Sequence, residues 1–171
     1  MVSLQLDAHS RRRSWVLTGL IMGVLAGIIF AMFEMLMAAI LGQGFFMPLR
    51  MIGAIVLGQR ALDPAYFLAV AGLVGLVVHM ILSGLYGMVF GAVAGSIPFV
   101  RASRFAVILA ASIFGLLLWL VNFFLIAPLA FPWFGMANPL VQVVAHIFFY
   151  GTALGLLLAT RRAGRAVRTV R

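Results

Sequence analysis

The sequence predicts an all-α, polytopic membrane protein: four transmembrane helices in an up-down bundle, with a short interfacial helix between the first and the second. Of the 171 residues, 65% are hydrophobic and 9% are charged, whereas soluble domains have roughly 45–50% and roughly 25%. The apolar residues gather in four runs, each long enough to cross a hydrocarbon layer of about 30 Å. We therefore expect a single membrane domain over residues 1–171.

The first apolar run covers 15–41 and follows three consecutive arginines at 11–13. It is about twice as long as the core of a signal peptide, so we expect an uncleaved transmembrane helix. Gly19, Gly23 and Gly27 lie four residues apart within it. Small residues at this spacing let two helices approach closely in a membrane, which predicts a packing face.

The segment 42–64 is predicted to hold a short helix that does not span the membrane. Pro48 suits the first turn of a helix, and the apolar run that it opens ends at Leu57. A run of this length is too short to cross a bilayer. We therefore place it at or just within the membrane surface.

The second spanning helix is predicted over 65–95, and one ridge of it is built from small and polar residues. A step of four along this ridge meets Gly75, His79, Ser83, Gly87, Gly91 and Gly95. We expect Gly87, Gly91 and Gly95 to pack on the glycines of the first helix. A polar side chain on such a ridge should face a neighbouring helix, because lipid would leave its polar atoms unpaired.

The remaining chain predicts a third helix over 105–127, ended by Pro128, and a fourth over 139–160. The loop between them has no charge and is rich in aromatic residues, which suits the membrane interface. A basic tail follows at 161–171.

The arginines predict the orientation of the bundle. Ten of them fall at the ends of the helices on the side of both termini, and two, Arg50 and Arg60, fall on the other side. By the positive-inside rule, we expect both termini to be cytoplasmic.

The formal charge of +9 is explained by this topology, so we expect the lipid bilayer as partner and no nucleic acid. Four arginines of the tail gather near one helical face, where each can contribute about 1 kcal/mol of binding to anionic lipid headgroups. The alternative is that they enforce topology alone. These residues are Arg161, Arg162, Arg165 and Arg168.

Five polar residues within the spans are the candidate site. At about 1.5 Å per residue, four of them come to similar depths and are expected to form one layer in the outer leaflet. His79 lies deeper and would form the floor of this layer. The four are Glu34, Asn122, Gln142 and His146.

An ionisable residue inside a bilayer is a functional hypothesis by default. We expect a non-enzymatic binding or translocation site, in which Glu34 and His146 form a charged or proton-exchanging pair and Asn122 and Gln142 orient the bound species. Two alternatives stay open. The polar residues can serve as interhelical hydrogen bonds alone, or Glu34 can pair with Arg50. The whole chain can also be an accessory or assembly subunit of a larger membrane complex, or a homo-oligomer.

No cofactor, metal or catalytic residue is assigned. The chain has no cysteine and ten methionines. Methionine is a soft ligand and favours a soft ion such as Cu(I), which stays an alternative. Five methionines are expected near the outer side: Met32, Met35, Met37, Met47 and Met51. A b-type haem between His79 and His146 is a further alternative, opposed by predicted depths that differ by about 10 Å. The glycine repeats do not form a phosphate-binding loop, because no lysine follows them. Ser83 and His79 do not make a nucleophile pair, because no acidic residue is placed to orient the histidine.

Three stretches resemble those of uncharacterised bacterial four-helix membrane proteins. They are the segments 42–50 and 115–124 and the run from His79 to Gly87. The resemblance implies an inner-membrane location and brings no activity, so no functional residue is transferred from it.

Overall fold

The computed structural model describes residues 2–168, with side chains described for 13–160. Within 2–168 the chain is helical apart from short connections, and it contains no strand. Four helical stretches are long and apolar enough to cross a membrane, and a shorter apolar helix lies between the first two, which confirms the predicted fold class. These four stretches are Arg13–Ile40, Leu68–Ser96, Arg104–Ala130 and Pro139–Thr160.

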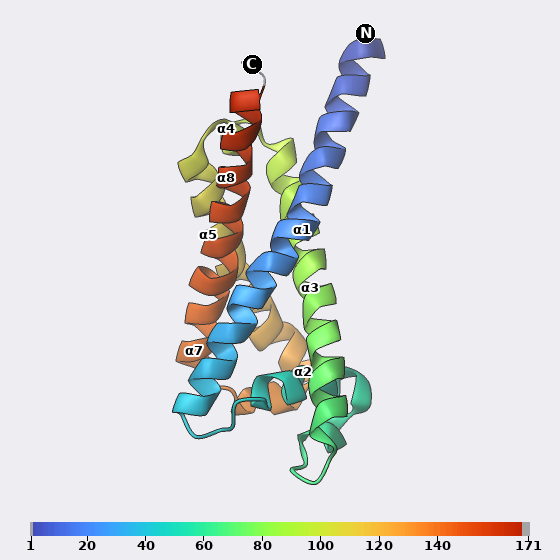
Figure 1. Ribbon diagram of the computed structural model, residues 1–171, viewed down its shortest axis with the longest axis vertical. Coiled ribbons are helices and arrows are strands. Elements are labelled where there is room, and N and C mark those ends of the chain that lie inside the picture. The colour runs from blue at the N-terminus through green and yellow to red at the C-terminus, as the bar shows by residue number, and fades with distance from the viewer. Residues whose placement is uncertain (1, 169–171) are drawn as a thin grey trace.

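The first half of the bundle is a long hairpin with a short helix at its turn (Figure 1). Helix α1 (Val2–Ile40) runs away from the end that holds both termini. At the opposite end, which we call the distal end, come α2 (Met47–Leu57) and the 3-10 turn η1 (Gln59–Leu62). Helix α3 (Leu68–Ser96) then returns along α1.

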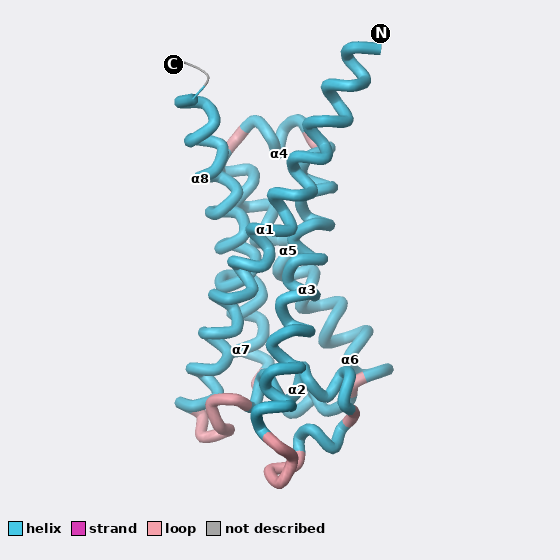
Figure 2. The backbone as a smooth tube through the Cα atoms, turned by 45° about the vertical axis from the view of Figure 1, so that its right-hand side comes forward, coloured by secondary structure: helices cyan, strands magenta, loops and turns pink. Residues whose placement is uncertain are grey.

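The second half repeats this path. A short α4 (Pro98–Ala102) precedes α5, which runs to the distal end, and α8 returns to the end with the termini (Figure 1). The loops gather at the two ends of the bundle (Figure 2). The elements are α5 (Arg104–Val121), η2 (Asn122–Ile126), α6 (Ala127–Ala130), η3 (Pro132–Met136), α7 (Pro139–Val144), η4 (Ala145–Thr152) and α8 (Ala153–Arg168).

Both long helices of the second half contain a π-helical segment, η2 and η4. The third span was predicted to end before Pro128, but the structure carries it to Ala130. Proline lacks an N–H and its ring clashes with the carbonyl one turn back in an α-helix. The wider turn of η2 ends at Ile126, two residues before Pro128, and it makes room for the proline ring, so the helix continues.

The glycine ridges of α1 and α3 face each other in close contact. A Cβ atom built on Gly23 would lie 2.5 Å from the carbonyl oxygen of Ser83, and one on Gly87 would lie 2.6 Å from the Cα of Gly23. Gly19 meets Gly87 and Gly91 in the same way. The two backbones therefore touch, with no room for a methyl group between them.

At the two ends of this contact between the glycine ridges, which we call the α1–α3 seam, the glycines meet side chains rather than other glycines. Gly95 and Gly91 lie against Trp15, whereas Gly27 lies beside the side chains of Ser83 and His79. The α3 ridge thus follows α1 along most of its length and reaches the polar residues at the level of Gly27.

Between the distal end and His79, the α3 ridge packs on α2 instead of α1. A Cβ on Gly53 would lie 2.5 Å from the carbonyl oxygen of Ala71, and Gly75 meets the backbone of Leu49. Helix α2, predicted from Pro48 to Leu57, is therefore built into the bundle rather than lying free on its surface. It holds α1 and α3 apart at the distal end, beside the cavity described below.

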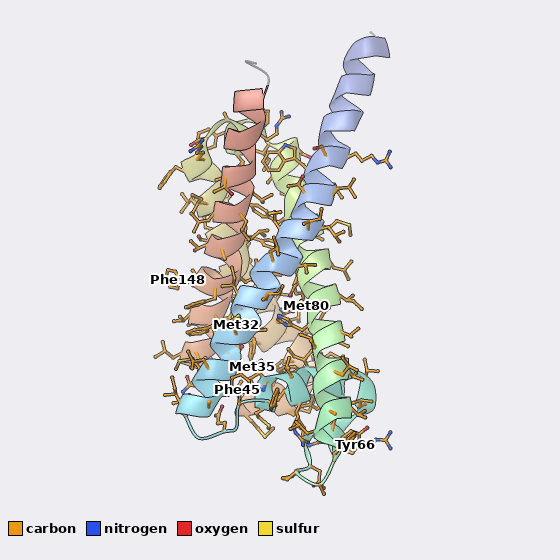
Figure 3. The ribbon with its side chains drawn as sticks, viewed as in Figure 1. Met32, Met35, Phe45, Tyr66, Met80 and Phe148 are labelled. Carbon is orange, nitrogen blue, oxygen red and sulfur yellow. The ribbon has the colours of Figure 1, made fainter. Side chains whose placement is uncertain are left out.

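Long apolar side chains cover the outside of the spans (Figure 3). Met32 and Phe148 are 67% and 57% exposed. The buried core towards the termini consists of smaller and aromatic residues, among them Ala26, Phe90 and Leu154. An apolar exterior around such a core is what a bilayer requires.

The described arginines divide between the two ends as predicted. Arg101 and Arg104 lie in α4 and at the start of α5, at the end that holds the termini, and Arg50 and Arg60 lie in α2 and η1 at the distal end. The side chains of the tail arginines 161, 162, 165 and 168 lie outside the described side chains.

Candidate functional site

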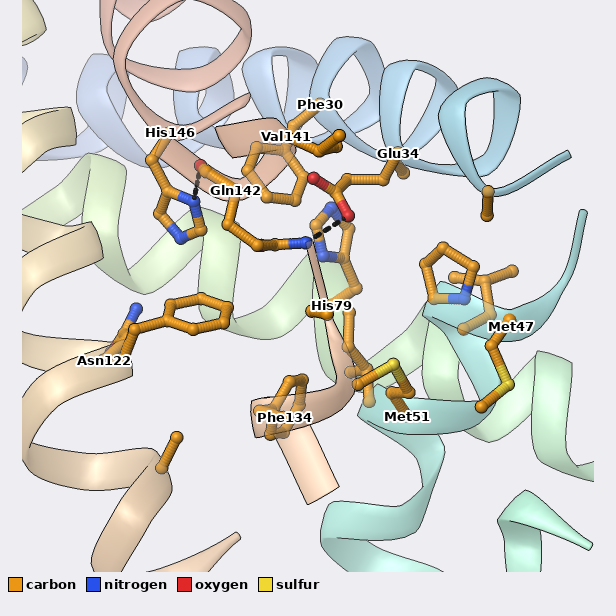
Figure 4. Close-up of a pocket in the computed structure, with 18 of the residues that line it drawn as sticks. Phe30, Glu34, Met47, Met51, His79, Asn122, Phe134, Val141, Gln142 and His146 are labelled. Atoms are coloured by element: carbon orange, nitrogen blue, oxygen red, sulfur yellow. Dashed lines mark hydrogen bonds between the residues drawn. The ribbon is translucent and has the colours of Figure 1, made fainter. Parts of the chain in front are cut away.

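A cavity of about 420 Å³ lies inside the distal half of the bundle. Helices α1, α2 and α3 form one side of it, and η2, η3, α7 and η4 form the other (Figure 4). All five polar residues singled out in the sequence line this one cavity: Glu34, His79, Asn122, Gln142 and His146.

Glu34 is bonded across the cavity wall to Gln142. The Nε2 amide of Gln142 on α7 donates to Oε2 of Glu34 on α1 at 2.6 Å, and both residues are buried. The second carboxylate oxygen, Oε1, is buried and has no hydrogen-bond partner in the described part of the chain. A buried acceptor without a partner costs about 1–3 kcal/mol, so Glu34 is only half satisfied.

His146 is held by its own helix. Its Nδ1 donates to the carbonyl oxygen of Gln142 at 2.8 Å. A carbonyl oxygen can only accept, so Nδ1 carries the proton, and in the neutral ring Nε2 keeps a lone pair. Nε2 has no partner among the described residues, and the ring extends from η4 towards the side of the cavity that holds Asn122 (Figure 4).

His79 is held by the facing helix. Its Nε2 donates to the carbonyl oxygen of Gly27 on α1 at 2.8 Å, and the hydroxyl of Ser83 lies 3.4 Å from the same nitrogen. In the neutral ring the lone pair is therefore on Nδ1, which has no hydrogen-bond partner in the described structure. The glycine at position 27 makes room for the side chain of Ser83, because a Cβ atom there would lie 2.5 Å from the Cβ of Ser83.

Phe30 orients both imidazoles. Its ring stacks on His79 with a centroid distance of 5.4 Å and meets His146 edge-on at 4.9 Å. Offset and edge-on arrangements of this kind are the favourable ones for aromatic rings. Two rings from α3 and η4 are thus fixed against one side chain of α1.

Five further polar residues line the cavity, although their positions in the sequence did not assign them to the site. They are Gln43, Ser83, Tyr86, Asn138 and Tyr150. The hydroxyl of Tyr150 donates to the carbonyl oxygen of Ser83 at 2.6 Å, and that of Tyr86 donates to Oδ1 of Asn122 at 3.2 Å. Tyr150 follows His146 by four residues, so the same spacing that singled out Gln142 and His146 also indicates it.

The rest of the lining is apolar and rich in methionine and phenylalanine. Of the five methionines near the outer side, Met35, Met37, Met47 and Met51 line the cavity, whereas Met32 is largely exposed on the outside. Met47 and Met51 project from α2, on the side away from Asn122 and His146 (Figure 4). Phe131 and Phe134 contribute from the segment after α6.

Arg50 does not pair with Glu34. Its guanidinium donates to the carbonyl oxygens of Ala61, Asp63 and Tyr66 at 2.9, 2.7 and 3.0 Å. It therefore fixes the turn between α2 and α3. Among the described residues no group of three or more histidine, aspartate or glutamate side chains is placed to hold a metal ion.

The cavity is closed towards the termini. The bond from Tyr150 to Ser83 lies at its floor, and Phe90 packs on Phe114 in the core on the terminal side. The close backbone contact of Gly19 with Gly87 continues this closure.

The fold and the cavity together define a class: a helical bundle with four membrane-spanning stretches and a polar cavity inside its distal half. No protein-family model matches the chain, and neither the curated proteins nor the solved structures match it. Any statement about function therefore has to come from the cavity.

Proposed function

We propose that the protein is a non-enzymatic integral membrane protein that binds a small, largely apolar molecule in its distal cavity. The observation that carries this proposal is the half-satisfied carboxyl group of Glu34 at the wall of a cavity of about 420 Å³. Ligand sites are typically cavities of about 300–1,000 Å³ with an apolar lining and a few convergent polar groups. This cavity has that size and that composition.

Binding is favoured over translocation. A translocation path would need polar residues on both sides of the cavity. Towards the termini the described chain offers mainly tightly packed glycine and apolar residues, such as Gly19, Gly87 and Leu154. The polar pair of Ser112 and Thr152 also lies there, but its hydroxyls bond to each other and to backbone carbonyls.

A non-enzymatic role is supported by the state of the serine–histidine pair at the cavity. Ser83 lies closest to Nε2 of His79, and this nitrogen donates its proton to Gly27. It cannot accept the serine proton at the same time, so the pair does not form an activated nucleophile.

We further propose that the protein lies in a bacterial inner membrane with both termini in the cytoplasm. The positions of Arg101 and Arg104 at the terminal end support this orientation through the positive-inside rule. The cavity would then lie in the outer leaflet, and the tail arginines would contact anionic headgroups.

An accessory-subunit role has less support. The glycine faces that such a role would offer to a partner helix are used within the bundle, since Gly19, Gly23 and Gly27 all meet α3. The exposed surface consists mainly of long apolar side chains, which suit lipid.

The proposal is tested by native mass spectrometry of the protein released from lipid nanodiscs. Ala38 lines the cavity and is 4% exposed, whereas Leu36 on the same helix is 54% exposed. We expect the wild type to carry a bound small molecule, which Ala38→Phe loses by filling the cavity and Leu36→Phe keeps. Equal adduct masses in both variants, or none in the wild type, would contradict cavity binding.

The same preparation tests the alternatives. A stable complex with a second protein would support the subunit role, and a haem spectrum in the purified protein would support ligation by His79 and His146.

A further inference from the structure

We infer that the ligand of the distal cavity is a hydrophobic amine: a compact apolar body that carries one cationic ammonium group. This inference rests on the proposed function of the cavity as a binding site, and it identifies the chemical class of the molecule bound there.

The polar atoms that remain unpaired at the cavity are mainly acceptors. Oε1 of Glu34 has no partner. Nδ1 of His79 and Nε2 of His146 each keep a lone pair, because the other nitrogen of each ring donates to a carbonyl oxygen. A ligand that donates hydrogen bonds would pair with the two imidazole lone pairs and the carboxylate oxygen.

The tyrosine hydroxyls of the lining are already used. The hydroxyls of Tyr86 and Tyr150 donate to Asn122 and Ser83, and one amide hydrogen of Gln142 is directed at Glu34. Arg50 on α2 donates its guanidinium hydrogens to three backbone carbonyls. Among the described residues, none with a permanent positive charge lines the cavity, so an anionic ligand would find no countercharge there.

The carboxyl group of Glu34 is suited to a cation. An ionised carboxylate that is 94% buried needs a charged partner, and the described protein provides only the amide of Gln142. Rotation about the last side-chain bond of glutamate is soft, so the carboxylate can exchange its hydrogen bond with Gln142 for one to a donor in the cavity. An ammonium group supplies both the charge and several donors.

The apolar lining limits the rest of the ligand. Four methionines and the rings of Phe30, Phe123 and Phe134 surround the polar residues. Methionine side chains adapt to ligands of irregular shape. A single branched or aromatic body of drug-like size fits this space, whereas a free inorganic cation would leave the apolar lining empty.

The test compares three probes with one body and different head groups: 4-butylbenzylamine, 4-butylbenzyl alcohol and 4-butylbenzoate. Binding of each radiolabelled probe to the full chain in nanodiscs is measured by scintillation proximity near neutral pH, with empty nanodiscs subtracted. We expect the amine to bind about tenfold more tightly than the alcohol, as a charge-assisted hydrogen bond allows, and the benzoate not to bind.

Two variants assign the effect to Glu34. Glu34→Gln should lower the affinity for the amine by about tenfold and leave the affinity for the alcohol nearly unchanged. The retained binding of the alcohol shows that the variant is folded. Asp63→Asn makes the same chemical change at an exposed turn outside the cavity, and it should leave all three affinities unchanged.

Several outcomes would overturn the inference. If the alcohol or the benzoate binds as tightly as the amine, the amine class is wrong while the cavity remains a binding site. If the Glu34→Gln variant keeps full affinity for the amine, Glu34 is not the partner. If no probe binds the wild type, the inference fails, and the mass of the molecule that co-purifies decides the proposed function separately.

Discussion

At the scale of single residues, the distal cavity gains its character from polar side chains that have one atom paired and another free. Glu34 and Gln142 share one strong hydrogen bond, and each histidine donates from one ring nitrogen to a backbone carbonyl. These bonds fix the orientation of the side chains and leave their second atoms unused. Fixed polar groups with free atoms are what the proposed ligand site requires.

The bond between Glu34 and Gln142 should appear in a double-mutant cycle. Gln142→Met keeps the length of the side chain but leaves the carboxyl group with neither oxygen bonded, so we expect a loss of about 1–3 kcal/mol in unfolding free energy. Adding Glu34→Met removes the stranded group and should recover most of this loss, because replacing both partners by apolar groups is nearly neutral. Unfolding in mixed micelles measures both. Additive losses in the double variant would show that the two side chains do not interact.

Which residues meet at the cavity could be anticipated, but not how they bond. Helical spacing and depth indicate that Gln142, His146 and Glu34 come to one level, because a helix rises by a constant step. The partner of each atom depends on how far each helix is rotated and tilted, which spacing does not specify. The contact of Phe30 with both imidazoles likewise joins three helices and has no local signature.

At the scale of elements, the α1–α3 pair acts as a rigid frame and the second hairpin supplies the irregular wall. Both π-helical segments, η2 and η4, contribute to the cavity, through Asn122 and His146 respectively. Such segments are frequent at functional sites because they shift side chains out of α-helical register. The apolar periodicity that predicts a helix does not distinguish an α-turn from a π-turn, so these segments were not predicted.

The α1–α3 seam predicts opposite effects for two glycine substitutions. A methyl group at Gly23 meets backbone atoms of Ser83 and Gly87, which cannot move aside, so we expect Gly23→Ala to destabilise the protein by about 1–3 kcal/mol. At Gly72 in α3 an added Cβ meets nothing within 4 Å. Gly72→Ala should therefore be neutral or stabilising by up to about 1 kcal/mol, through helix propensity.

Thermal unfolding of both variants in the same detergent, followed by size-exclusion fluorescence, makes the comparison. Wild-type stability of the Gly23 variant would show that the helices are not in backbone contact there. A loss in the Gly72 variant equal to that at Gly23 would show that any glycine substitution is harmful, whatever its position.

At the scale of the whole molecule, the division of charge agrees with the path of the chain. The bundle has one end with both termini, α4 and most arginines, and a distal end with two arginines and the cavity. This arrangement follows from the sequence because each loop contributes its charges to one side of the membrane. The position of α2 does not follow in this way, because its packing on Ala71 and Gly75 requires the tertiary structure.

The orientation can be measured directly, since the chain contains no cysteine and single cysteines need no altered background. Gln59 at the distal end and Ala102 at the terminal end are both exposed. With the termini in the cytoplasm, a membrane-impermeant maleimide should label Gln59→Cys in intact spheroplasts and Ala102→Cys after permeabilisation alone. The reverse pattern would place the cavity in the inner leaflet, and labelling of both positions in a sealed membrane would contradict a single orientation. Because the arginine excess at the terminal end is large, we expect one orientation throughout.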